Sequence, residues 1–159
     1  METSTPLIME KTSEKNTAAF THLSTLSQYI IPFGNYIFPL IIWTSYKDKS
    51  EFADHHGKQA LNFQLSLLLY TLILALIAIP IFITVILQNI PIEAVFNDHD
   101  FMITNFDFQS HIGLLSIGIT AVILFGLLKF VEFFLVIYAS IKASNGELYK
   151  YPITIPFIK

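Results

Sequence analysis

Two charged residues interrupt a long apolar stretch in the C-terminal half of this chain. Lys129 and Glu132 carry the only charges between residues 112 and 141. They lie three positions apart, so on a helix they share one face and can form an ion pair. A charge at the centre of a bilayer costs about 2.5–3.5 kcal/mol. The pair is therefore either a path for ions, protons or substrate, or a contact that fixes how helices assemble. The second interpretation is favoured, because the preceding apolar stretch has no acidic residue to extend such a path.

A second set of polar residues recurs every three or four positions and therefore lines one face of a helix. The set comprises His55, Gln59, Asn62, Ser66 and Tyr70. Asn and Gln in membrane helices usually hydrogen-bond to neighbouring helices, so we interpret this stripe as a contact between helices. A groove for a polar partner is the alternative. Gln64 lies on the opposite face and could make a second contact.

Chemistry that needs a metal or a nucleophile has little support. His55 and His56 are adjacent, but the chain has no cysteine and no carboxylate at metal-ligand spacing. His22 shares a short predicted helix with Ser24 and Ser27, without the context of a nucleophilic site. Motifs for phosphate loops, zinc hydrolases and serine hydrolases are absent from the sequence. We therefore predict no enzymatic activity, no cofactor and no metal, and keep His22 and His56 as candidate polar contacts between helices.

The distribution of apolar residues indicates the elements that position these side chains. Hydrophobic residues make up 53% of the chain and charged residues only 13%, about half the ~25% of a soluble domain. Three apolar stretches cover residues 19–46, 60–87 and 112–141, and about 20 apolar residues suffice to cross a bilayer. The expected fold is an all-α integral membrane protein with three transmembrane helices, the first kinked or broken at Pro32–Gly34.

The first stretch has an alternative, because Pro32-Phe33-Gly34-Asn35 is good turn chemistry. With a turn there, residues 19–46 form a re-entrant helical hairpin beside two spanning helices. Non-helical backbone at bilayer depth needs protein or water around it, and 28 residues make a comfortable kinked span. The distribution of lysines favours the hairpin, whereas economy favours the span.

The connecting segments differ in charge, and this predicts the orientation. Residues 47–58 and 142–159 hold three lysines each, whereas 88–110 holds none and is acidic. Lysine-rich loops stay in the cytoplasm, so we predict a multi-pass protein of the bacterial cytoplasmic (inner) membrane with a cytoplasmic tail over 142–159. Residues 88–110 form an acidic outer loop, whose Asn97–Asp100 cluster is interpreted as solvated, and residues 1–18 a disordered polar tail. With a net charge of −3 and no arginine, nucleic acid is not an expected partner.

Three ordered blocks over about residues 20–159 carry a resemblance to a known family. The blocks are His22–Ser24 with Ile31–Asn35 and Phe38–Trp43; Asp54–Gln64; and Ala139–Lys159, which includes Lys142–Glu147 and Tyr151–Thr154. They resemble the Tic20-like family of small bacterial membrane proteins, distant relatives of a chloroplast inner-envelope import component. The resemblance implies a Tic20-like membrane domain over 19–159 and favours a single kinked crossing for residues 19–46, so three spans are preferred.

These observations together predict a non-enzymatic subunit or assembly factor of a membrane complex, acting through contacts between helices. The expected partners are the lipid bilayer and other membrane protein subunits or further copies of this chain. The alternative is a transport or protein-translocation component that uses the Lys129/Glu132 pair.

Overall fold

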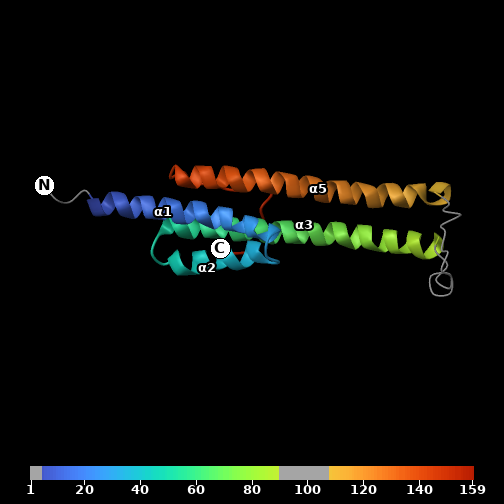
Figure 1. The fold of residues 1–159 in the computed structure, drawn as a ribbon, viewed down its shortest axis with the longest axis horizontal. Coiled ribbons are helices and arrows are strands. Elements are labelled where there is room, and N and C mark those ends of the chain that lie inside the picture. Colours follow the sequence, from blue (N-terminus) through green and yellow to red (C-terminus); the bar gives the residue numbers. More distant parts are fainter. Residues whose placement is uncertain (1–4, 90–107) are drawn as a thin grey trace. The chain divides into compact units, whose positions relative to one another are not determined.

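The computed structural model describes residues 5–89 and 108–159, and all regular structure in these ranges is helical (Figure 1). The elements follow one another as α1 (Thr5–Ser24), the short 3-10 helix η1 (Thr25–Tyr29), α2 (Gly34–Tyr46), α3 (Glu51–Asn89) and α5 (Phe108–Ser144). Within the described residues, two helical segments are long and apolar enough to cross a membrane, Glu51–Gln88 and Gln109–Ser144. The all-helical fold is thus confirmed, but three spans are not.

The first apolar stretch is broken where the sequence analysis expected a kink or break. Phe33 adopts a left-handed backbone with φ +62°, and a Cβ atom at Gly34 would collide with Ser27. Pro32 has no N–H to continue a helix. The chain therefore reverses, and α2 runs back along α1 (Figure 1). This backbone differs from a single kinked crossing and has the form of the alternative, a helical hairpin.

The helices also begin and end outside the limits expected for them. A helix starts at Thr5, where the sequence analysis expected a disordered tail over residues 1–18. The second and third apolar stretches, 60–87 and 112–141, lie inside the longer helices α3 and α5. Most of the predicted acidic loop, including Asn97–Asp100, lies outside the described residues.

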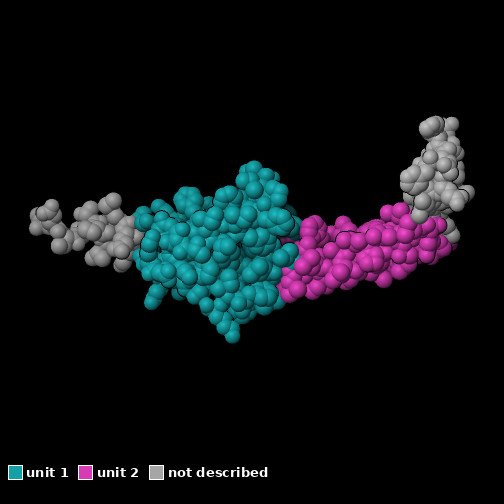
Figure 2. All heavy atoms as spheres, turned by 90° about the horizontal axis from the view of Figure 1, so that it is seen from below, with its two compact units in different colours: residues 1–68, 129–159 teal, residues 69–128 magenta. Residues whose placement is uncertain are grey.

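The chain divides into two compact units, which Figure 2 distinguishes by colour. Unit 1 holds residues 1–68 and 129–159, and unit 2 holds residues 69–128. In unit 2, α3 and α5 contact each other closely at Gly118, where an added Cβ would lie 3.2 Å from Ile81. Ile77 and Thr120 help to line an apolar groove of about 260 Å³ between the same helices.

Unit 1 has an unusual distribution of polarity, because its interior is rich in polar side chains. The buried polar residues of the described ranges all belong to it: Thr21, His22, Thr25, Asn35, His56, Asn62, Gln64, Ser66, Glu132 and Ser140. Many large apolar side chains, such as Ile30, Phe33 and Phe130, are exposed instead. A water-soluble domain has the opposite arrangement, so this distribution suits a protein surrounded by lipid.

Candidate functional site

The carboxylate of Glu132 lies at the centre of the first polar cluster. Its side chain is fully buried. Lys129 Nζ donates to Oε2 at 2.9 Å, while Gln28 Nε2 and Gln64 Nε2 donate to Oε1 at 2.8 and 3.0 Å. Three donors on one carboxylate offset the cost of removing its charge from water. The ion pair expected from the spacing of Lys129 and Glu132 is therefore part of a larger network.

This network joins four helical elements of unit 1. Lys129 Nζ also donates to Gln28 Oε1 at 3.1 Å, and Asn35 Nδ2 donates to Gln64 Oε1 at 2.7 Å. The participating side chains come from η1, α2, α3 and α5. Gln28 and Asn35 were not among the candidates from the sequence. Their position on either side of the Pro32 turn was the available signal, since polar residues in an uncharged apolar stretch need partners.

Two buried histidines form the second cluster. His22 Nε2 lies 2.8 Å from His56 Nδ1, and the Tyr151 hydroxyl lies 2.9 Å from His22 Nδ1. Burial, followed by the nearby His56 and His55, lowers the pKa of His22 to about 3. Burial also raises the pKa of Tyr151 well above its usual value. Both side chains are therefore uncharged at neutral pH.

The hydrogen bonds of this cluster favour one direction. If the Tyr151 hydroxyl donates to His22 Nδ1, the proton of His22 lies on Nε2 and is donated to His56 Nδ1. The proton of His56 then lies on Nε2. That atom is buried and has no hydrogen-bond partner within the described residues, although the backbone of Glu147 interacts with the ring. The opposite direction would leave the Tyr151 proton without an acceptor among these groups.

The third group is the polar stripe of α3, which binds the C-terminal end of the same chain. We call residues 145–159 the C-terminal strap. Asn62 accepts the N–H of Ile158 at 2.8 Å and donates to its carbonyl at 2.9 Å. Ser66 Oγ accepts the N–H of Ile155 at 2.8 Å. These contacts join a helix to a non-helical segment, whereas contacts between helices were expected from the sequence.

Tyr151 connects the strap to the histidine cluster. Its N–H donates to Gln59 Oε1 at 3.3 Å, and its ring stacks on Phe63 with the centroids 4.0 Å apart. The ring is buried, and its hydroxyl reaches His22 on α1. The strap therefore holds α1 and α3 together. Tyr151 was not a candidate from the sequence, where it appeared only in the block Tyr151–Thr154 that carried the family resemblance.

The eight candidate residues thus fall into three separate groups of unit 1. Lys129, Glu132 and Gln64 share the carboxylate network; His22 and His56 form the histidine cluster; Gln59, Asn62 and Ser66 bind the strap. Within the described ranges, no three His, Asp or Glu side chains come together as metal ligands. The arrangement is well suited to holding helices in one packing.

These features define a helical membrane protein with a polar core. A sequence profile of the magnetosome magnetite crystal formation protein family (MamF/MmsF) matches residues 13–158, so the chain belongs to this family. No curated protein and no solved structure matches the chain.

The family assignment corrects the resemblance to the Tic20-like family, which is wrong. Two of the blocks that carried it, Asp54–Gln64 and Ala139–Lys159, contain the residues through which α3 binds the strap. Such residues reflect a local packing arrangement, and a similar arrangement does not establish common function. The role in protein import that the resemblance implied is therefore withdrawn with it.

Proposed function

We propose that this protein is a non-enzymatic membrane component that acts in magnetite crystal formation at the magnetosome membrane. Its membership of the MamF/MmsF family over residues 13–158 is the observation that carries the proposal. The two long apolar helices, α3 and α5, supply the membrane anchor.

The polar clusters support a scaffolding role in this process. Their buried donors and acceptors bind to one another across helices, as in the network around Glu132. We propose that this core holds unit 1 in one shape, against which other membrane proteins of the same system, or further copies of this chain, pack. The Lys129/Glu132 pair serves as a structural contact here, and neither the family nor the described residues favour a transport role.

The lysines of residues 47–58 and 142–159 support a cytoplasmic position for both segments. We therefore propose a cytoplasmic C-terminus, with the strap packed on the cytoplasmic end of α3. The protein would be inserted into the cytoplasmic membrane of the bacterium.

The proposed function is tested by deleting the gene in a magnetite-forming bacterium and measuring crystal size and number by electron microscopy. Wild-type protein should restore the crystals of the deletion strain. Affinity purification after mild detergent extraction should recover further membrane proteins or a homo-oligomer. Unchanged crystals in the deletion strain, or recovery of a lone monomer in several detergents, would contradict the proposal.

A further inference from the structure

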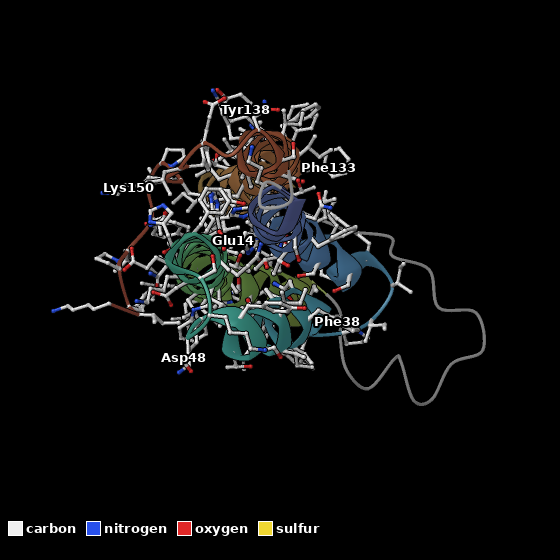
Figure 3. All side chains as sticks on the ribbon, turned by 90° about the vertical axis from the view of Figure 1, so that its left-hand side faces the viewer. Glu14, Phe38, Asp48, Phe133, Tyr138 and Lys150 are labelled. Carbon is white, nitrogen blue, oxygen red and sulfur yellow. The ribbon has the colours of Figure 1, made fainter. Side chains whose placement is uncertain are left out.

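The hairpin formed by η1 and α2, residues 25–46, turns its apolar side chains outward. Ile37 and Ile41 of α2 are about half exposed, while Asn35 on the opposite face is 5% exposed. Phe38 also lies on the outside of the helix, as does Phe133 on α5 (Figure 3). No charged residue occurs from Asn16 to Tyr46. A surface of this kind is stable against hydrocarbon and unfavourable against water.

The tip of the hairpin is the most exposed apolar part of this segment. Ile30 is 85% exposed and Phe33 71%. The backbone of the turn nevertheless satisfies most of its own donors, because Ile31 N–H binds Ser27 O at 2.8 Å and Gly34 N–H binds Ile31 O at 3.0 Å. Pro32 has no N–H to satisfy. Unpaired backbone groups normally exclude a turn from lipid, and these hydrogen bonds lower that cost for the turn.

The hairpin is too short to cross a bilayer. The 13 residues of α2 make a helix of roughly 20 Å at 1.5 Å per residue, whereas the hydrocarbon core measures about 30 Å. The distance along α3 between its contacts with the two ends of α2 is similarly short. Trp43 Nε1 donates to Asp54 Oδ1 at 2.8 Å near one end of α2, and Asn35 binds Gln64 near the other. The ten residues from Asp54 to Gln64 rise only about 15 Å along α3.

The open end of the hairpin has the composition of a membrane–water interface. Lys47 Nζ lies 5.4 Å from the centre of the Trp43 ring, and Lys49 Nζ lies 5.1 Å from that of Tyr46. Trp and Tyr beside Lys are typical anchors at the level of lipid headgroups. The apolar tip therefore lies deeper in the membrane than this charged end.

We propose that residues 25–46 form a re-entrant hairpin that inserts its apolar face among the acyl chains of one leaflet and returns to the same surface. Its partner is the lipid of that leaflet. The chain then crosses the bilayer twice, through α3 and α5. The part of α1 around residues 13–17, which lies beside Tyr46 and Lys49, and the turn at residues 47–50 lie on one side of the membrane. This topology is independent of the role in crystal formation.

Single cysteines test the topology directly, because the full chain contains none. Asn16→Cys, Asp48→Cys and Gln109→Cys are placed before the hairpin, after it and at the start of α5. In cells opened only at the outer membrane, an impermeant maleimide should leave Asn16→Cys and Asp48→Cys unlabelled and label Gln109→Cys. Permeabilisation should then allow all three to react. If Asn16→Cys, but not Asp48→Cys, is labelled before the inner membrane is permeabilised, the chain crosses three times and the proposal is overturned.

Fluorescence quenching tests the contact with lipid. Ile30→Cys carries an environment-sensitive dye in vesicles of phosphatidylcholine and phosphatidylglycerol, with a spin-labelled acyl chain introduced into one leaflet. Quenching should be strong from the leaflet on the Asp48 side and lost when only the opposite leaflet is labelled. Leu76→Cys, on the exposed apolar surface of α3, is the positive control. If Leu76→Cys is quenched but Ile30→Cys is not by either leaflet, protein covers the tip and the proposal fails.

Discussion

Asn62 binds both backbone groups of Ile158, accepting the N–H at 2.8 Å and donating to the carbonyl at 2.9 Å. A neighbouring strand would offer the same pair of hydrogen bonds, and here a single amide side chain of α3 supplies them. Because an amide presents a donor and an acceptor side by side, this contact satisfies the N–H and the carbonyl of Ile158 together. It attaches the end of the strap to a helix that lies nearly 100 residues earlier in the sequence.

Replacing Asn62 with Ala should loosen the strap. Both backbone groups of Ile158, which are part-buried, lose their partner, and a hydrogen bond of this kind contributes about 0.5–1.5 kcal/mol. Limited proteolysis with trypsin in detergent should therefore cut after Lys150 faster than in the wild type. Gln59→Ala is the matched control, since it removes one longer bond of 3.3 Å and should have a smaller effect. Equal cleavage rates in wild type and Asn62→Ala would contradict the role of this contact.

Tyr151→Phe should destabilise unit 1 without removing the stacked ring. The variant keeps the packing on Phe63 but leaves His22 Nδ1 without its partner, at an expected cost of about 1–3 kcal/mol. Tyr151→Ala also creates a cavity and should cost about 3–5 kcal/mol by analogy with other large aromatic truncations. Thermal unfolding in one detergent gives both values. The prediction fails if the two variants unfold at the same temperature.

Acidification should destabilise the fold through His22. Its pKa is about 3 in the folded protein and 6.5 in the unfolded reference, so below pH 6.5 the unfolded state binds more protons. The contribution of the uncharged His22 to the free energy of unfolding is therefore fully present above pH 6.5 and is lost as the pH falls toward 3. The slope for one histidine approaches about 1.4 kcal/mol per pH unit.

Denaturant unfolding in detergent at a series of pH values measures this slope. His22→Gln cannot titrate and should show a shallower dependence than the wild type, even though its stability at neutral pH is lower. Parallel curves for the two proteins would assign the pH dependence to other groups.

Removing the Glu132 carboxylate should be among the most damaging single changes in unit 1. Glu132→Ala leaves three donors without their acceptor, and breaking a buried pair typically costs about 3–5 kcal/mol. Lys129→Met should cost less, because Gln28 and Gln64 still donate to the Glu132 carboxylate. The double variant Lys129→Met/Glu132→Gln should recover part of the loss. Unfolding measurements on the wild type, Lys129→Met, Glu132→Gln and this double variant form a closed cycle that gives the coupling energy. Effects of the two single variants that simply add would show that the pair is not coupled.

The spacing of residues along one helix predicted two kinds of feature. It predicted contacts between residues of the same helix, and it predicted which polar residues share a helix face. The ion pair of Lys129 with Glu132 follows from their separation of three residues, and the stripe of Gln59, Asn62 and Ser66 does share a face. The occupant of that face could not be predicted in this way. The strap lies far away in sequence, and its backbone, which any residues could supply, makes the hydrogen bonds.

The hairpin shows the second limit of the sequence. Pro32 and Gly34 indicated a break, but both a kink and a full reversal are compatible with such residues. The reversal is stabilised by Gln28 and Asn35, which reach Glu132 and Gln64 only when η1 and α2 pack against α3 and α5. A resemblance built on short blocks then favoured a single kinked crossing, which the described backbone does not confirm, because it covered the turn without identifying these partners.

The shortness of the η1–α2 hairpin has a mechanical consequence. A segment that ends partway through a bilayer takes up area in one monolayer and none in the other. Two joined sheets of unequal area relieve the mismatch by bending, with the larger sheet on the convex side. In the cytoplasmic monolayer, residues 25–46 would favour a membrane that is convex toward the cytoplasm and encloses a lumen on its other side. This is the shape of a small vesicle that buds from the cytoplasmic membrane into the cytoplasm.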